Sequence, residues 1–592
     1  MSSQRYRLSG GTTIRTDTPL SFTFDGKSYH GYKGDTLASA LIAAGVHLIG
    51  RSFKYHRPRG IMSAGSEEPN ALVRVGTGAY AEPNLKATQV ELYDGLIATS
   101  QNRFPSLKYD VGSINSVMSQ FLPAGFYYKT FMWPASFWMT YEHFIRNAAG
   151  LGKVASDPID PERYEKTHRH CEILIAGGGA AGLMAAYQAA LSGQRVMLVD
   201  EQAEFGGWLL SDDAVKIDNM PAYDWVREMQ SLLSNMDNVT LLPRATMFGY
   251  GDHNYITLAE RVTDHLSPRP SHLPRMRLWK VRVAQVILAT GCIERPLVFG
   301  GNDLPGVMLA SAVQSYITQY GALPGSRAII VTNNDTAYQA ALAFQNAGGF
   351  VRAIVDTRTT VKGAWVKAAK DAGIDILSGH GLTGAYGIHH VGRVEISPIS
   401  ADGREITGEA VHMDCDLVMM SGGLTPTVHL HSQARGKLVW DEKHLCFKPG
   451  ATHEAEQSIG ACNGSFALSS GLAEAIRAAT KAVKSTGGTC TALSVPDVTA
   501  LRINYAPMAY WKAPSQAGAG QGPKAFVDFQ NDVTSADIQL AVREGYQSVE
   551  HVKRYTTTGM ATDQGKTSNM NALGILADAL GHEISDVGTT TF

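Results

Sequence analysis

The sequence predicts an α/β protein, in which parallel strands alternate with helices from about residue 171 to residue 490. The first observation is the order strand, Gly-rich turn, helix, strand that begins at Cys171–Ala176, a nearly continuous apolar run typical of a parallel strand covered on both faces. The second is the return of the same order between Arg327 and Asp356. At 592 residues the chain also exceeds a single hydrophobic core, so we expect several domains.

The composition excludes several classes of protein. Hydrophobic residues make up 44% and charged residues 18% of the chain, and the formal net charge of -2 offers no basic excess for a nucleic acid. The six cysteines lie far apart and form no CxxC pair, which argues against a zinc ribbon, a local iron–sulfur cluster and a redox-active disulfide. Together with an N-terminal segment that has no apolar signal-peptide core, they predict a cytoplasmic protein.

The N-terminal residues predict a β-grasp, ferredoxin-like domain. Ser21–Tyr29 has the pattern of a hairpin with Asp25-Gly26 as its two-residue turn, and Thr36–Ala44 that of a short helix ended by glycine. Further strands are expected at Ala71–Val75 and Gln89–Leu92. A hairpin, a helix and then more strands is the order of the β-grasp fold.

An aromatic connector is expected next. Its stretch Phe121–Tyr141 is apolar, but two prolines and a lysine interrupt it, which disfavours a membrane-spanning helix of about 20 apolar residues. We interpret it as a buried connector, and keep a partner-binding patch as the alternative because aromatic residues are enriched in interface cores. A linker is expected at Asp157–Pro161.

The most specific motif is the G-x-G-x-x-G turn of Gly177, Gly179 and Gly182, with Asp200 at the end of the following strand. Gly177 allows a tight turn and Gly182 allows the helix to pack on the strand. Gly179 lets a pyrophosphate approach the helix N-terminus, where free N–H groups and the helix dipole favour an anion. Asp200 is expected to accept hydrogen bonds from ribose hydroxyls, and its charge disfavours the 2′-phosphate of NADP.

Later stretches support a dinucleotide site. Val286–Gly291 is an apolar strand that ends in Thr-Gly, and Ser458–Ser465 resembles the later strand-to-helix turn of two-dinucleotide oxidoreductases. In that fold this turn reaches the pyrophosphate from the other side. Met247 follows the strand-like Val239–Leu242, where such folds offer backbone to adenine.

The second βαβ pattern has a weaker loop. Strands are expected at Arg327–Thr332 and Val351–Asp356 with a helix over Thr336–Ala347, but Thr-Asn-Asn-Asp-Thr-Ala stands where glycines belong. Asp335 would repel a pyrophosphate, whereas Asp356 is in place for a ribose. We interpret this unit as structural and as inserted into the first.

A flexible linker at Ser515–Gly522 precedes a last, mostly helical unit. These patterns divide the chain into a β-grasp domain, an aromatic connector, a first dinucleotide-binding domain in two segments, a second βαβ domain and a helical domain, over 1–105, 106–165, 166–305 with 410–495, 306–409 and 523–592.

Other polar residues are interpreted as structural. The basic run from Arg51 to Arg59 is interpreted as a solvated loop, with a phosphate or partner contact as the alternative. His429 and His431 are interpreted as satisfied surface or core histidines, because no further ligand lies at metal-binding spacing beside them.

Four stretches resemble the alpha subunit of heterotetrameric sarcosine oxidase, namely Arg51–Gly60, Ile287–Pro324, Ser421–Asp441 and His551–Asn569. The resemblance runs from about residue 20 to the end of the sequence. The family's alpha subunit usually continues into an aminomethyltransferase-like folate domain that the resemblance does not reach, so we expect no folate binding by this chain alone.

The resemblance implies a core of two dinucleotide-binding domains, Rossmann-like and FAD/NAD(P)-binding, with a tightly bound NAD in the first and FAD as the alternative. It implies FAD and covalent FMN in a partner beta subunit, with gamma and delta subunits completing the oxidase. Sarcosine is oxidised at that FAD, and electrons pass to FMN and then to oxygen, so no residue of this chain is catalytic. The implied NAD contacts are Gly177, Gly179, Ala181, Gly182, Asp200, Glu201, Gln202, Trp208, Met247, Ala461, Phe466 and Leu468.

The resemblance extends to two modules that hold iron–sulfur clusters in related opine and amine dehydrogenases, the ferredoxin-like domain and a C-terminal BFD-like domain. At the positions of the relatives' cysteines this chain has Ser63, Glu68, Ala71, Asp528, Gln530 and Asp563. Because such clusters need thiolates, we expect no iron–sulfur cluster.

Two alternatives remain beside an oxidase subunit. One is the FAD-binding subunit of an opine or amino-acid dehydrogenase, which the missing cluster cysteines disfavour. The other is an autonomous FAD/NAD(P)H oxidoreductase, which the second loop disfavours. In the C-terminal domain, Gln564 and Lys566 could reach a partner's flavin phosphate, and a solvated turn is an equal alternative.

Overall fold

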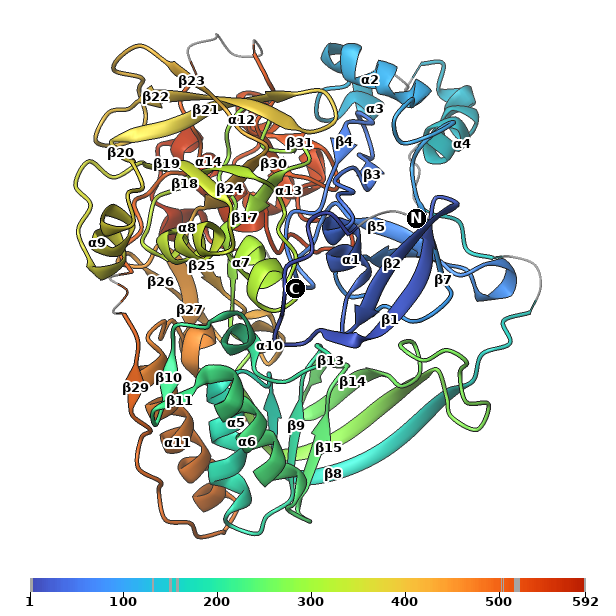
Figure 1. Ribbon diagram of the computed structural model, residues 1–592. Helices are drawn as coiled ribbons and strands as arrows, with labels where there is room; N and C mark the ends of the chain where they lie inside the picture. The colour runs from blue at the N-terminus through green and yellow to red at the C-terminus, as the bar shows by residue number, and fades with distance from the viewer. Residues whose placement is uncertain are drawn as a thin grey trace. The chain divides into compact units, whose positions relative to one another are not determined.

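The computed structural model describes residues 4–129, 133–148, 152–155, 159–501, 503, 505–515 and 522–589. Parts of the stretch Phe121–Tyr141 and of the linkers predicted at Asp157–Pro161 and Ser515–Gly522 lie outside these residues. The chain forms two compact units (Figure 1). The large unit comprises Met1–Asp160, Glu294–Gly423 and Ala506–Thr591, and the small unit comprises Pro161–Ile293 and Leu424–Tyr505.

The large unit begins with a five-stranded mixed sheet in the order β2-β1-β7-β5-β6. The predicted hairpin of β1 (Arg15–Phe24) and β2 (Lys27–Lys33) is confirmed. Asp25 and Gly26 in its turn have φ values of 48° and 75°, the left-handed values that a two-residue turn of this kind needs. The other strands are β5 (Leu72–Val75), β6 (Glu82–Lys86) and β7 (Leu96–Ser100), of which β7 runs parallel to β1.

The strand predicted at Gln89–Leu92 is wrong. The backbone there bonds to the residues around the start of α1 (Leu37–Ala43): the Leu37 N–H donates to the Val90 carbonyl at 2.8 Å and the Leu92 N–H to the Asp35 carbonyl at 2.9 Å. The helix itself is confirmed, since Thr36 caps it together with Ser39 in a capping box. All seven of its residues are buried in the core of the large unit.

The connector consists of short helices, α2 (Ile114–Val117), α3 (Phe126–Lys129) and α4 (Trp138–Ala148). The interpretation of a buried connector is wrong for the described residues of Phe121–Tyr141, because several large apolar side chains there are exposed, Phe121, Trp133 and Met139 among them. In the part of the chain that the structure describes, no helix combines the length and the apolar character that crossing a membrane requires.

The second βαβ pattern forms a parallel five-stranded sheet in the large unit, in the order β17-β24-β18-β19-β20. The predicted strands and helix are confirmed as β18 (Arg327–Thr332), α8 (Thr336–Asn346) and β19 (Phe350–Asp356). Its other elements, with the antiparallel sheet β21-β22-β23, are β17 (Val307–Leu309), α7 (Ala310–Thr318), α9 (Ala364–Asp371), β20 (Ile376–Ser378), β21 (His380–Gly387), β22 (Val391–Pro398), β23 (Val411–Asp414) and β24 (Leu417–Ser421).

The position of β24 differs from the predicted domain boundary, which assigned 410–495 to the first dinucleotide-binding domain. All five residues of β24 are buried, and a strand of this kind needs a neighbour on each side. It finds them in β17 and β18, with Val418 beside Val307 and Ile329. The change from one unit to the other therefore comes after Gly423.

The C-terminal residues of the large unit are mostly helical, as predicted. Thr534 and Asp537 form a capping box at the start of α12. The elements are β30 (Phe526–Asp528), β31 (Val533–Thr534), α12 (Ser535–Arg543), α13 (Val549–Thr556), α14 (Asn569–Leu580) and α15 (Ile584–Val587).

The small unit is built on a seven-stranded sheet in the order β12-β9-β8-β15-β14-β13, with β28 beside β15. Its parallel part carries the predicted order of strands, and α5 and α11 pack against each other, as Figure 1 shows. The elements are β8 (Tyr164–Ala176), α5 (Ala180–Ala190), β9 (Val196–Val199), α6 (Ala222–Ser234), β12 (Val239–Leu242), β13 (Ala245–Gly251), β14 (Tyr255–Arg261), β15 (Met276–Leu288), α10 (His429–Gln433), β28 (Glu456–Ser458) and α11 (Leu468–Ser485).

Candidate functional site

The three motif glycines have different surroundings in the turn between β8 and α5. Gly177 has φ +102°, and a Cβ there would lie 2.3 Å from the Ala289 carbonyl oxygen. A Cβ on Gly182 would lie 1.8 Å from the Gly177 carbonyl oxygen, so both positions exclude a side chain. Gly179, the N-cap of α5, has φ −71°, and a Cβ there would meet no atom within 4 Å. The backbone is therefore close-packed on both sides of an open space at the helix N-terminus.

The Asp200 side chain stabilises this turn through hydrogen bonds, a role that the sequence did not indicate. One carboxylate oxygen accepts the Gly178 N–H at 2.6 Å and the other accepts the Gln202 N–H at 2.7 Å. Each oxygen keeps a second lone pair, so the ribose contact stays a prediction. Burial raises the pKa of Asp200 from its ordinary 3.8 to about 6, although these hydrogen bonds lower it.

This raised pKa predicts a pH dependence for the nucleotide-free protein. Because the folded state holds the proton more tightly than the unfolded chain, the contribution of Asp200 to stability is full below its ordinary pKa of 3.8 and is lost as the pH rises through about 6. We expect the difference in unfolding free energy between wild type and Asp200→Asn to fall by roughly 2 kcal/mol between about pH 4 and pH 7. Urea unfolding across this range measures it, and a pH-independent difference contradicts it.

A second loop lies against the Gly-rich turn. The Gly206 N–H donates to the Gly178 carbonyl at 2.8 Å, and a Cβ on Gly207 would lie 3.2 Å from the Gly179 Cα. Trp208 follows in a short 3-10 helix (Gly207–Ser211) and is exposed. The signal for this loop in the sequence is the Gly-Gly pair, both members of which have positive φ.

The turn before α11 also reaches the Gly-rich turn. A Cβ on Gly460 would lie 3.2 Å from the Ala181 Cβ, so Ala461 follows directly on a residue beside the start of α5. Glu474, which sequence reasoning missed, holds this turn by accepting the Gly460 N–H at 2.8 Å and the Ser465 hydroxyl. The two turns predicted to share a dinucleotide are thus brought together.

The remaining predicted contacts are placed by neighbouring elements. The ring of Phe466 stacks at a tilt against Tyr505, with 4.6 Å between centroids, and Leu468 begins α11. The strand β13 that carries Met247 starts beside the site, because the Ala245 N–H donates to the Asp200 carbonyl at 2.8 Å. The backbone carbonyls of Glu201 and Gln202 accept hydrogen bonds from the Arg261 guanidinium and the Arg244 N–H, at 2.9 Å and 2.8 Å.

The corresponding loop of the large unit is filled by its own side chains. Asn333, Asn334 and Asp335 are each at most 1% exposed. Arg358 forms an ion pair with Asp335 at 2.8 Å and another with Asp356 at 2.7 Å. Asp356, in place for a ribose, also accepts the Tyr338 hydroxyl at 2.8 Å. This arrangement supports the structural interpretation of the second βαβ unit.

Arg358→Met is therefore expected to weaken the fold without affecting the nucleotide. The substitution leaves the buried carboxylates of Asp335 and Asp356 without their shared cation. We expect the unfolding free energy of the large unit to fall by roughly 2 kcal/mol, less than for a fully buried pair. Urea unfolding and the nucleotide content of the purified protein measure both effects, and a loss of nucleotide at unchanged stability contradicts the interpretation.

The residues at the expected cluster positions bond within their own modules. Glu68 is buried, and its carboxylate accepts N–H groups from Met62 at 2.9 Å, Ser63 at 2.7 Å, Asn70 at 2.8 Å and Ala71 at 3.0 Å. Asp528 accepts the Asn531 N–H at 2.8 Å and the Gly559 N–H at 2.7 Å. Burial and the neighbouring Asp563 raise the pKa of Asp528 to about 7.

Gln564 and Lys566 follow Asp563 in the large unit. Gln564 is exposed, with φ 52°, and its side-chain amide donates to the Ala561 carbonyl at 2.7 Å. Lys566 is half-buried. The pKa of the Lys86 amine is lowered mainly by burial, and the nearby charge of Lys566 lowers it further.

His431, in the small unit, is a satisfied core histidine, as interpreted. Its ring nitrogens lie 2.6 Å from a Glu456 carboxylate oxygen and 3.0 Å from the Lys437 carbonyl. Among the residues that the structure describes, no three His, Cys, Asp or Glu side chains are grouped closely enough to hold a metal ion.

Three families match parts of the chain. Residues 171–446 match "Pyridine nucleotide-disulphide oxidoreductase", residues 522–592 match "Sarcosine oxidase A3 domain", and residues 17–103 match "2Fe-2S iron-sulfur cluster binding domain". The last match contradicts our expectation of no iron–sulfur cluster, which rested only on the missing cysteine ligands. The matched stretch contains no cysteine, since the first in the chain is Cys171, so the match identifies the module by its family and carries no detail of a cluster.

Relatives match the chain over nearly its whole length. It is 47% identical to "Sarcosine oxidase subunit alpha" of Rhizobium meliloti (strain 1021), over 99% of this chain and 58% of that one, and 37% identical to the protein of that name from Corynebacterium sp. (strain U-96), over 98% and 56%. The chain thus spans less than two thirds of these relatives.

Among solved structures, L-proline dehydrogenase from P. horikoshii has a TM-score of 0.64 at 17% identity, covering 98% of this chain and 96% of that one, a likeness of fold. That fold and the family match over residues 171–446 establish an α/β dinucleotide-binding fold. With the matches to the named subunits, they show that over the shared length the chain belongs to the sarcosine oxidase subunit alpha family.

Proposed function

We propose that the chain is the NAD-binding alpha subunit of a multi-subunit, flavin-dependent sarcosine oxidase. The reaction is the oxidative demethylation of sarcosine to glycine, with oxygen reduced to hydrogen peroxide and the methyl carbon leaving as formaldehyde or as methylene-tetrahydrofolate. The observation that carries the proposal is the open space at Gly179, at the N-terminus of α5, in a chain 47% identical to a sarcosine oxidase alpha subunit.

The dinucleotide lies across this helix N-terminus. Its pyrophosphate accepts the unpaired N–H groups in the first turn of α5, where the helix dipole also favours an anion. Asp200, already bonded to the turn, accepts the ribose hydroxyls with its remaining lone pairs. The turn around Ala461, Phe466 and Leu468 closes the other side, and Trp208, Glu201, Gln202 and Met247 complete the surroundings. When bound, NAD holds these turns together and carries no hydride in the reaction.

The chemistry takes place outside this chain. Sarcosine is oxidised at the flavins of a beta subunit, and gamma and delta subunits complete the enzyme. Gln564 and Lys566, on the turn before α14, reach the phosphate of a partner's flavin. The β-grasp and BFD-like modules serve as scaffolding for this assembly, and the cytoplasmic location stays a prediction.

An autonomous oxidoreductase with FAD and NAD(P)H in the two βαβ units is the weaker candidate. Arg358, Asp335 and Asp356 occupy the place where its second nucleotide would bind. A dehydrogenase subunit with FAD at Gly179 differs from our proposal in the nucleotide. The Gly-rich turn does not separate FAD from NAD, because both molecules present the same adenosine pyrophosphate to it.

The nucleotide distinguishes these functions. The chain is purified alone, denatured, and the released molecule identified by absorbance and mass spectrometry. We expect NAD and no flavin. Release of FAD overturns the proposal in favour of the dehydrogenase subunit or of an autonomous oxidoreductase. Coexpression with beta, gamma and delta subunits then measures sarcosine-dependent hydrogen peroxide, which the assembled enzyme produces and this chain alone does not.

A further inference from the structure

One segment of the large unit exposes an unusual run of apolar side chains. Between residues 104 and 121, seven large apolar residues are exposed, with Val117 at 80% and Phe121 at 66% of full exposure. They are Phe104, Tyr109, Val111, Ile114, Val117, Met118 and Phe121. Single exposed apolar residues are common on protein surfaces, but a concentration within one short segment is typical of an interaction site. We refer to residues 104–121 as the apolar segment.

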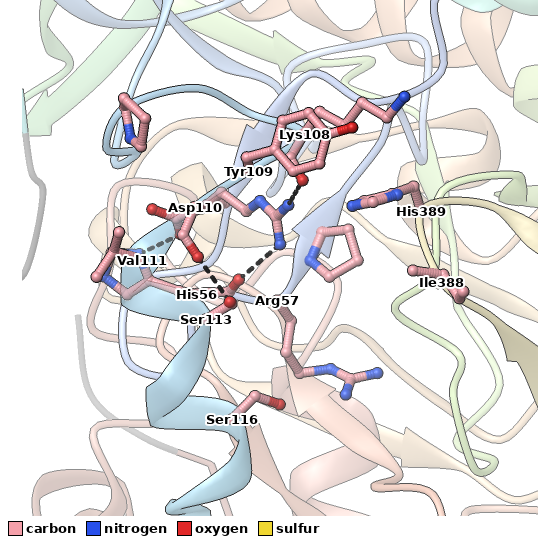
Figure 2. Close-up of a pocket in the computed structure, with 13 residues that line it drawn as sticks. His56, Arg57, Lys108, Tyr109, Asp110, Val111, Ser113, Ser116, Ile388 and His389 are labelled. Atoms are coloured by element: carbon pink, nitrogen blue, oxygen red, sulfur yellow. Dashed lines mark hydrogen bonds and ion pairs between the residues drawn. The ribbon is translucent and has the colours of Figure 1, made fainter.

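A cavity of about 600 Å³ borders this segment, and Figure 2 shows its lining side chains. Pro105, Tyr109 and Val111 come from the apolar segment, Pro58 from β4 (Pro58–Arg59), and Ile388 from the turn between β21 and β22. The cavity wall is therefore apolar on several sides, and it continues into the exposed face of the segment.

The cavity lining also carries more positive than negative charge, because Arg51, Arg57 and Lys108 share it with a single carboxylate, that of Asp110. The guanidinium of Arg51 donates to neutral backbone carbonyl oxygens, that of Leu107 at 2.8 Å and that of His56 at 3.1 Å. Among the described residues, neither Arg51 nor the exposed Lys108 has a carboxylate within ion-pair distance. A carboxylate that enters the cavity would find both cations.

The other charged lining residues already have partners. Asp110 lies 2.8 Å from His56 Nδ1 and accepts the Phe104 N–H at 2.9 Å. Arg57 is paired with Asp303 through two hydrogen bonds, the longer of 2.8 Å. With Arg57 paired to Asp303, the cations Arg51 and Lys108 exceed the Asp110 carboxylate by one positive charge.

We infer that the apolar segment and this cavity form a docking surface for a partner protein subunit, which inserts a carboxylate side chain flanked by apolar residues. The matched relatives are named subunits, so a partner chain belongs to their assembly. A protein is favoured over a lipid surface because anionic membranes are bound by clusters of roughly four to eight Lys and Arg, and two unpaired cations fall short of that. An anion alone would not need the apolar border. The inference rests on the proposed function in that it requires an assembled oxidase.

The test uses charge-altering substitutions on exposed residues, which leave the core untouched. Val117→Asp and Phe121→Asp place a charge on the apolar segment, and Lys108→Glu reverses one of the two unpaired cations. Phe350→Asp and Lys362→Glu are the matched controls, because both residues are exposed elsewhere on the large unit. Each variant is coexpressed with beta, gamma and delta subunits of sarcosine oxidase, and its melting temperature is compared with that of wild type.

We expect the three surface variants to bind the other subunits about tenfold or more weakly than wild type, with unchanged melting temperatures, while both controls assemble normally. Amide hydrogen exchange in residues 104–121 should also slow when the wild-type chain assembles. Normal assembly of the surface variants overturns this inference and leaves the proposed function intact, whereas failure of wild type to assemble overturns both. Flotation of the wild-type chain with phosphatidylcholine–phosphatidylglycerol vesicles, lost in the same variants, would assign the surface to a membrane instead.

Discussion

Gly179→Val is expected to remove the bound dinucleotide and to leave the fold intact. The backbone at Gly179 has φ −71°, which valine adopts, and a Cβ there meets no protein atom within 4 Å. The isopropyl group would instead occupy the space at the N-terminus of α5 that a pyrophosphate needs. We expect the affinity for the nucleotide to fall by roughly a hundredfold, equivalent to about 2.7 kcal/mol.

Two other glycines provide the controls, Gly182 in the same turn and Gly392 in β22. A methyl group in Gly182→Ala would lie 1.8 Å from the Gly177 carbonyl oxygen, so this variant is expected to lose stability as well as nucleotide. Gly392→Ala, where the nearest atom to a new Cβ is 3.9 Å away, should change neither property. Nucleotide content by mass spectrometry and thermal unfolding separate the two effects. Retention of the nucleotide by Gly179→Val at wild-type level would place the binding site elsewhere.

Arg59→Met is expected to destabilise the large unit by about 3–5 kcal/mol, because it leaves two buried carboxylates without a cation they share. The Arg59 guanidinium, 1% exposed as a residue, donates to Asp303 and to Asp532. Asp303 is also paired with Arg57, and Asp532 accepts the N–H groups of Lys54 and Tyr55 at 2.8 Å each. The network joins three stretches of the large unit that are hundreds of residues apart in sequence.

This network also corrects the interpretation of Arg51–Arg59 as a solvated loop, since its arginines are buried or paired. Urea unfolding of the full chain measures the effect of Arg59→Met. Arg404→Met is the matched control, because Arg404 forms an exposed ion pair with Asp578, and such pairs contribute about 0–1 kcal/mol. Equal unfolding free energies for the two variants would show that the network adds nothing beyond a surface ion pair.

The elements predicted correctly are those whose signals are local. The Asp25-Gly26 hairpin turn, the short helix α1 and the strand Arg327–Thr332 each follow from the conformational preferences of adjacent residues. The Gly-rich turn before α5 belongs to the same class. The spacing of its three glycines indicated which positions would be close-packed and which would be open. The atom that crowds Gly182 lies within the strand–turn–helix unit, whereas Gly177 is crowded by the Ala289 carbonyl oxygen, just after β15.

The tertiary structure alone decided the contacts between residues that are distant in the sequence. Glu474 bonds to a turn fourteen residues before it, Arg358 fills the second loop, and Arg59 joins carboxylates hundreds of residues away, none of which a local pattern encodes. The same reason explains the errors at Gln89–Leu92 and in the aromatic connector. Whether a stretch of apolar residues is paired, buried or exposed depends on what lies beside it in space. The periodicity of its own side chains does not indicate that neighbour.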